Sequence, residues 1–99
     1  MLIRSQDKRM IVNFENICTV SAFPEKDSED IYVEDGTGSL MVGRYSTKEK
    51  AIKVLDMIQK AYSEYQIMLN FSVSYLHEFK EKTDGFAIFQ MPEDSEVEE

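Results

Sequence analysis

The residues that could act as a nucleophile or a general base are few in this sequence. His77 is the only histidine and Cys18 the only cysteine among its 99 residues. A hydrolase or transferase usually needs a base near a nucleophile or a metal ion, and neither residue lies in a common catalytic signature. We expect His77 to be an exposed helix residue and Cys18 to pack in a strand as a small hydrophobe. The sequence therefore predicts no enzyme and no catalytic residue, although a site defined only by its spatial geometry stays open.

A cluster of acidic residues could supply oxygen ligands to a hard cation. Its members are Asp27, Glu29, Asp30, Glu34 and Asp35. An EF-hand loop needs acids at fixed alternate positions, a central glycine and a closing glutamate, and this segment lacks that register. We therefore interpret residues 25–35 as a solvated loop and predict no metal site, while the order of the loop stays open.

A glycine-rich run, Gly36-Thr37-Gly38-Ser39, could in principle cradle a phosphate group. It contains no lysine of the P-loop kind, and it follows the acidic cluster, which would repel phosphate. The sequence therefore predicts no cofactor and no small-molecule substrate.

The net charge of -8 is concentrated in two segments. Residues 25–35 contain six acids and one base, and residues 93–99 contain five acids and no base. The rest of the chain has 10 bases and 8 acids, so it carries little net charge. Because such acidic runs are usually solvated, we predict a disordered tail over residues 93–99 and no direct binding to nucleic acid.

The totals indicate one folded domain, which we place at residues 1–92. Hydrophobic residues make up 42% of the chain and aromatic residues 11%, which excludes an intrinsically disordered protein. The longest apolar run is four residues, whereas a membrane-spanning helix needs about 20. Residues 1–4 lack the features of a signal peptide, and a single cysteine suits a reducing compartment. We therefore expect a cytoplasmic protein with no membrane contact.

A strong helix signal begins at residue 46. Ser46 and Glu49 have the spacing of a capping box, in which each side chain accepts the backbone N–H of the other residue. Apolar residues then recur at intervals of three and four, which predicts an amphipathic helix over residues 47–65. They are Ala51, Val54, Leu55, Ile58, Ala61, Tyr62 and Tyr65.

Short apolar runs separated by turn residues predict an antiparallel sheet before this helix. Residues 6–9 suit a hairpin loop, and the Asp35-Gly36 step readily takes a positive φ. A further run at residues 86–91 ends at Pro92 and predicts a final strand. The predicted fold class is α+β: an antiparallel β-meander of about five strands, with the helix packed on one face and the C-terminal strand rejoining the sheet. The five strands cover residues 1–5, 10–14, 17–23, 31–34 and 40–44.

The segment from residue 66 to residue 84 fits both a strand and a helix. Residues 69–75 alternate as in a strand, whereas residues 76–82 favour a helix. Its apolar density exceeds what one buried face explains, so we predict an interface with a second copy or another protein. The alternative is that the segment folds back over the open face of the meander and completes the core. The candidate interface residues are Tyr65, Ile67, Met68, Leu69, Phe71, Val73, Tyr75, Leu76 and Phe79.

Three segments carry a resemblance to a known family. They are Met1-Leu2-Ile3-Arg4-Ser5-Gln6-Asp7-Lys8, the joint that runs from Gly43 to Ile58 (GRYSTKEKAIKVLDMI), and Phe89-Gln90-Met91-Pro92. Together they resemble a family of small uncharacterised proteins of Gram-positive bacteria and their phages or mobile elements. The resemblance implies a shared α+β domain and implies no chemistry.

Two hypotheses for the function remain, from different classes. The first is a non-catalytic protein-interaction or oligomerisation module, with a homodimer or a protein partner. The second is an acidic inhibitor of the phage type, which mimics nucleic acid and blocks a nucleic-acid-binding protein. A mimic needs carboxylates fixed on a rigid surface, so the order of the acidic segments distinguishes the two.

Overall fold

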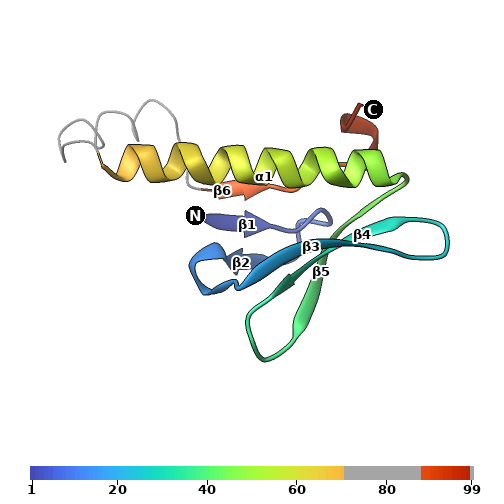
Figure 1. Ribbon diagram of the computed structural model, residues 1–99, viewed down its shortest axis with the longest axis horizontal. Coiled ribbons are helices and arrows are strands. Elements are labelled where there is room, and N and C mark those ends of the chain that lie inside the picture. Colours follow the sequence, from blue (N-terminus) through green and yellow to red (C-terminus); the bar gives the residue numbers. More distant parts are fainter. Residues whose placement is uncertain (71–87, 99) are drawn as a thin grey trace.

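The structure is a computed structural model that describes residues 1–70 and 88–98. It contains one long helix and two three-stranded sheets, and Figure 1 shows the helix lying along one side of the strands. The α+β class is therefore confirmed. In chain order the elements are β1 (Leu2–Arg4), β2 (Ile11–Asn13), the 3-10 helix η1 (Phe14–Asn16), β3 (Thr19–Pro24), β4 (Glu29–Glu34), β5 (Ser39–Tyr45), α1 (Lys48–Leu69), β6 (Ile88–Gln90) and the 3-10 helix η2 (Asp94–Glu96).

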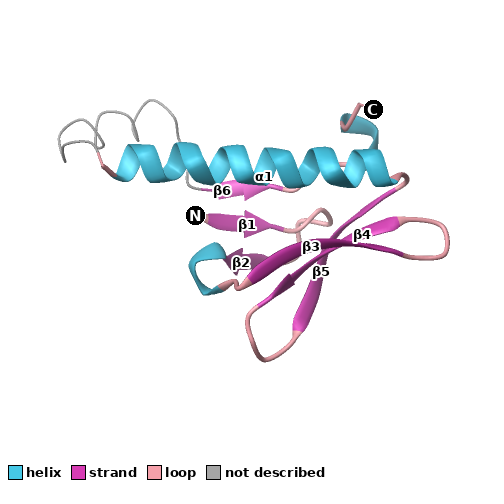
Figure 2. Cartoon of the chain, viewed as in Figure 1, coloured by secondary structure: helices cyan, strands magenta, loops and turns pink. Residues whose placement is uncertain are grey.

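The strands are close to the predicted positions, but they form two sheets instead of one meander. The orders are β2-β1-β6 and β3-β4-β5, as Figure 2 shows. The break lies at η1, where the Asn13 side chain accepts the N–H of Glu15 and turns the chain away from the β2 edge. The C-terminal strand does rejoin a sheet, where β6 pairs parallel with β1.

Both predicted hairpin turns are present. In the β1–β2 turn, Lys8 has φ 66°, and the Asp7 carboxylate accepts hydrogen bonds from the Ser5 hydroxyl (2.6 Å) and the Arg9 N–H (3.0 Å). Gly36 begins the β4–β5 turn with φ 93°, a conformation that glycine adopts without steric cost. Local residue chemistry therefore determines where these hairpins turn.

The helix begins one residue later than predicted, and the capping box assigned to Ser46 is wrong. Thr47 is the N-cap, and its hydroxyl accepts the N–H of Lys50 at 3.2 Å. Ser46 lies in the connection between β5 and α1, and its N–H donates to the Asp94 carboxylate at 2.7 Å. In the predicted capping box this N–H would bond to Glu49, whereas in the structure it bonds to a residue distant in sequence.

We expect Thr47→Ala to lower the free energy of unfolding by about 1 kcal/mol, because the substitution removes the bond to the first turn of α1. Ser46→Ala should cost less, since alanine keeps the N–H that binds Asp94 and loses only the additional side-chain bond of Ser46 to that carboxylate. Urea melts of the two variants beside the parent protein make the comparison. A larger loss for Ser46→Ala would contradict the assignment of Thr47 as the cap.

The inner face of α1 packs against β3, β4 and β5. Ala51, Val54 and Ile58 are buried on this face, as their spacing predicts. The helix continues past the predicted end at Tyr65 as far as Leu69. Figure 1 shows this last part extending beyond the strands. The apolar stripe is therefore confirmed over the sheet and continues where no strand lies beneath it in this view.

One buried core joins the helix to both sheets. Ile3 comes from β1, Ile31 and Val33 from β4, and Tyr45 from the end of β5. Met91, directly after β6, is also buried in it. Side chains from both sheets therefore share one interior, although no backbone ladder connects the sheets in the described part of the chain.

The acidic tail is not disordered, contrary to expectation. Residues 93–98 fold onto the body of the protein, and the Val97 side chain is only 6% exposed. The Asp94 carboxylate accepts the N–H of Ser46 and lies 3.4 Å from the Lys50 ammonium. These partners lower the pKa of Asp94, the Ser46 N–H having the largest effect. An acidic run becomes ordered here because the start of α1 offers donors and a positive charge.

The acidic segment at residues 25–35 is also not a loop throughout. Residues 29–34 form β4, where Asp30 pairs with Arg44 on β5 and is only 1% exposed. The Asp30 carboxylate accepts bonds from Arg44 Nη2 (3.0 Å) and from the Ser28 hydroxyl (2.8 Å). The interpretation as a solvated loop therefore holds only for the turn before β4, where Glu25, Lys26 and Asp27 are exposed.

Candidate functional site

The predicted interface residues are only partly within the described chain. At the end of α1, Ile67 is 57% exposed and Leu69 is 47% exposed, whereas Met68 is buried. Tyr65 is half-buried and packs against the core cluster. The other predicted members, and the helix predicted over residues 76–82 with His77, lie outside the described residues. Those other members are Phe71, Val73, Tyr75, Leu76 and Phe79.

An apolar cleft lies along the middle of α1. It has a volume of about 350 Å³ and is formed by α1 together with η1 and β3. Three elements build it, because α1 packs against β3 and Phe14 of η1 contacts Tyr62 of α1. The lining residues are Phe14, Val20, Leu55, Ile58, Gln59, Tyr62 and Ser63.

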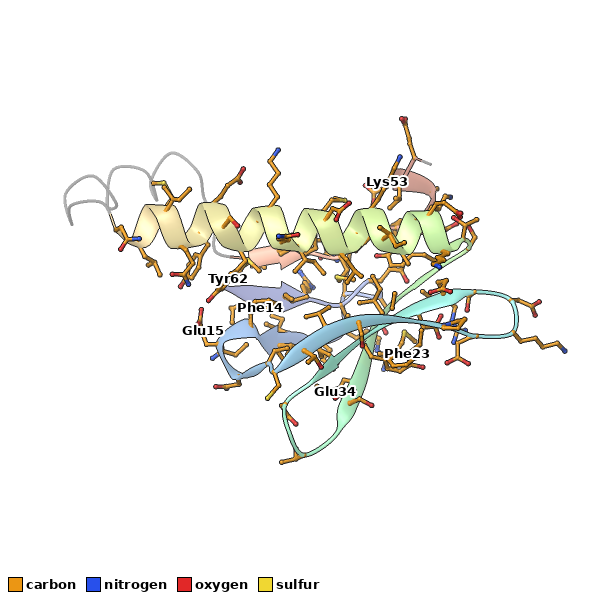
Figure 3. All side chains as sticks on the ribbon, viewed as in Figure 1. Phe14, Glu15, Phe23, Glu34, Lys53 and Tyr62 are labelled. Atoms are coloured by element: carbon orange, nitrogen blue, oxygen red, sulfur yellow. The ribbon has the colours of Figure 1, made fainter. Side chains whose placement is uncertain are left out.

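Aromatic side chains hold one wall of the cleft. Figure 3 shows Phe14 and Tyr62 close to each other below the helix, and their ring centroids are 4.8 Å apart. Tyr62 also lies 6.3 Å from the Tyr65 ring. The Tyr62 hydroxyl accepts a hydrogen bond from the Gln66 side-chain amide at 2.7 Å. Tilted aromatic pairs with a satisfied hydroxyl form a well-defined wall that can contact an apolar ligand.

The cleft is uncharged in the part of the chain that the structure describes. Gln59 and Ser63 are its polar lining residues, and both are exposed at the surface of α1. An unpaired carboxylate or ammonium placed among the apolar side chains would lose its hydration without finding a partner. The arrangement suits an uncharged, apolar group, and its lining offers no histidine, cysteine or carboxylate for acid–base or nucleophilic chemistry.

Of the two residues first considered for chemistry, Cys18 lies within the described residues and His77 lies outside them. Cys18 is exposed directly before β3, so the prediction that it packs as a small hydrophobe is wrong. Its N–H donates to the Glu34 carbonyl at 2.7 Å, which holds the backbone at the sheet and leaves the thiol outside. Among residues 1–70 and 88–98, no group of three His, Cys, Asp or Glu side chains could hold a metal ion.

The glycine-rich turn does not offer a phosphate cradle. The Asp35 carboxylate accepts the N–H groups of Thr37 (2.9 Å) and Gly38 (3.2 Å), and the Thr37 hydroxyl as well. These bonds, led by that of the Thr37 hydroxyl, lower the pKa of Asp35. A smaller cavity of about 200 Å³ lies beside the turn, and the negative carboxylate at its wall would repel an anion.

Sequence reasoning placed Tyr62 in the apolar stripe but did not bring Phe14 to it. Phe14 was expected at the end of a strand, yet it lies in η1 and faces α1. No sequence signal connects the two residues, because their contact depends on where η1 meets the helix. The cleft is a product of tertiary packing.

Comparisons of the chain with models of protein families, with curated proteins and with solved structures found no match. Within the described residues, α1 and the shorter helices lack the combination of length and apolarity that crossing a membrane requires.

Proposed function

We propose that the chain is a non-catalytic protein-interaction or oligomerisation module of bacterial or phage origin. The supporting observations are the apolar, uncharged cleft between the middle of α1, η1 and β3, and the exposed apolar side chains farther along α1 at its end. Such a surface gains free energy when a partner removes it from water. The family resemblance supports the bacterial or phage origin and assigns no activity.

We expect a second copy of the chain to be the first partner. Ile67 and Leu69 are exposed apolar residues at the end of α1, and isologous dimers are the commonest assemblies of soluble proteins. A cytoplasmic location accords with the free thiol of Cys18, because a reducing compartment keeps an exposed thiol reduced.

The second candidate, an acidic mimic of nucleic acid, gains one argument from the folded tail. Because residues 93–98 are ordered, their carboxylates occupy fixed positions on the surface. However, Asp94 bonds to Ser46 and Lys50, and the Glu96 carboxylate accepts the N–H of Glu93 at 2.8 Å. Carboxylates already bonded within the chain are less able to replace phosphates, so the interaction module remains the first proposal.

We expect a double variant, Ile67→Ser with Leu69→Ser, to weaken self-association at least tenfold, because it removes two exposed apolar side chains from the proposed contact. Sedimentation velocity over a range of protein concentrations measures the change, and the helical circular dichroism should stay the same. Met57→Ser is the matched control, since Met57 is 42% exposed on α1 but lies outside the helix end and the cleft.

A parent protein that stays monomeric at every concentration would contradict self-association. A double variant that unfolds would show instead that Ile67 and Leu69 support the core of the monomer. Equal effects of Met57→Ser and the double variant would contradict the choice of the helix end as the contact.

A further inference from the structure

Within residues 1–70 and 88–98, the outer edge of β3 is an unpaired hydrogen-bonding surface. The sheet order places β3 and β5 at the two edges of their sheet. On β5, Gln6 occupies part of the edge, since its N–H donates to Val42 O and its side-chain amide bonds both the N–H and the carbonyl of Arg44. On β3, no strand or side chain of the described residues bonds the outer backbone groups.

The hydrogen-bond ladder between β3 and β4 determines which residues of β3 direct their backbone groups toward this edge. Glu25 N–H donates to Ser28 O at 2.8 Å, which makes this pair a hydrogen-bonded one in the β3–β4 register. Because bonded and non-bonded pairs alternate in an antiparallel ladder, Val20, Ala22 and Pro24 point their backbone groups outward. Pro24 fits this position because it has no N–H to donate. The free donors of the edge are therefore the N–H groups of Val20 and Ala22.

This edge has only part of the usual protection against strand addition, because Pro24, which has no N–H, protects only its last position. Edge strands are commonly very short or carry charged residues that discourage pairing. β2 and β6 are short, with three residues each, whereas β3 has six residues and none of them is charged. A strand of this length and composition can accept another strand.

The apolar cleft lies directly beside the same edge. Val20 belongs both to β3 and to the lining of the cleft, and Leu55, Ile58 and Tyr62 of α1 form the opposite side. Side chains of an added strand alternate between the two faces of the sheet, so every second one would point toward α1. A volume of about 350 Å³ has room for an apolar side chain of this kind.

We propose that β3 binds an extended, uncharged peptide segment of a partner protein, which adds as a fourth strand and inserts an apolar side chain into the cleft. The proposal rests on the proposed function and names the kind of partner. Backbone bonds to Val20 and Ala22 supply affinity, and the uncharged cleft selects the inserted side chain. The chain's net charge of -8 further disfavours an acidic segment.

The test uses an end-blocked peptide of alternating threonine and valine with leucine at its centre, about seven residues long. Its control has the same sequence with alternate backbone nitrogens methylated, which removes donors and keeps the side chains. Hydrogen exchange of the full chain, followed by NMR, is the readout. We expect saturating peptide to slow exchange at Val20 and Ala22 about tenfold, with the outer edge of β5 unchanged, and the methylated control to bind about tenfold more weakly.

Two variants test the cleft. Gln59→Lys places a charge at its mouth and should weaken peptide binding about tenfold, whereas Met57→Lys adds the same charge on α1 outside the cleft and should have little effect. Both positions are exposed, so both variants should fold. Equal affinities of the two variants would overturn the assignment of the cleft.

Three results would overturn the proposal as a whole. The first is no slowing at Val20 and Ala22 with about 1 mM peptide, a concentration that would reveal even weak binding. The second is slowing only on β5. The third is slowing at β3 caused by self-association alone, which would make a second copy the occupant of the edge. If Ile67→Ser with Leu69→Ser abolishes self-association while the peptide leaves β3 unchanged, the proposed function stands and this inference fails.

Discussion

Tyr45→Ala is expected to lower the free energy of unfolding by about 3 to 5 kcal/mol, which could exhaust the stability of a domain of this size. The Tyr45 side chain is fully buried, and its hydroxyl donates to the Pro92 carbonyl at 2.8 Å. Its ring packs so tightly over Gly43 that a Cβ there would lie 2.9 Å from the ring. Alanine would leave a cavity where β5 meets the C-terminal segment, and denaturant melts measure the loss.

Tyr45→Phe is the matched control, because it keeps the ring and removes only the hydroxyl. We expect a loss of about 1 kcal/mol from the missing hydrogen bond. A tyrosine hydroxyl is protonated at neutral pH and can donate, and burial, assisted by the nearby Glu93, raises the pKa of Tyr45 further. Equal losses for the two variants would contradict the importance of the ring's packing.

Arg44→Met is expected to lower the free energy of unfolding at neutral pH, because it removes the cation that pairs with the Asp30 carboxylate. The loss should be smaller than for a fully buried ion pair, since the Arg44 side chain is 61% exposed and solvent screens it. The Asp30 side chain is 1% exposed and accepts bonds from both Arg44 Nε and Nη2. The double variant Asp30→Asn with Arg44→Met should recover part of the loss, since no buried charge then remains. Urea melts of the single and double variants beside the parent measure both effects.

The cost of Arg44→Met should depend on pH. The bond to Arg44 is the main cause that holds the pKa of Asp30 below its usual value, so the pair stabilises the parent above the pKa of an unfolded aspartate, about 3.9, and loses this contribution as the pH falls. In the variant, protonation removes the buried charge. The difference between parent and variant should therefore shrink between pH 7 and pH 3, and a constant difference would contradict the role of the ion pair.

Much of the fold follows from short-range chemistry, and the sequence alone was enough to predict it. The turn at Gly36 depends on φ preference, and the apolar face of α1 depends on the spacing of Ala51, Val54 and Ile58. The strands before α1 follow from apolar runs between polar turns. These features are local, since each is decided by residues a few positions apart.

Predictions from the sequence were wrong where a contact with a residue distant in the chain decided the local structure. Ser46 has the spacing of a cap, but Asp94 binds its N–H and Thr47 caps the helix instead. The tail was expected to be disordered from its acidic composition, but burial of Val97 and the bonds of Asp94 hold it. Composition predicts how acidic segments behave on average, whereas the contacts of Val97 and Asp94 determine that this segment is ordered.

The candidate site depends almost entirely on tertiary structure. The sequence alone determined that α1 would have an apolar stripe containing Tyr62, and that the chain carries more apolar side chains than one buried face requires. Only the tertiary structure brought Phe14 to Tyr62, separated β2 from β3 and left the outer edge of β3 without a partner among the described residues. The physical reason is that hydrophobic periodicity and turn-residue preferences act within one helix, strand or turn. A cleft or an unpaired edge depends instead on how separate elements pack together.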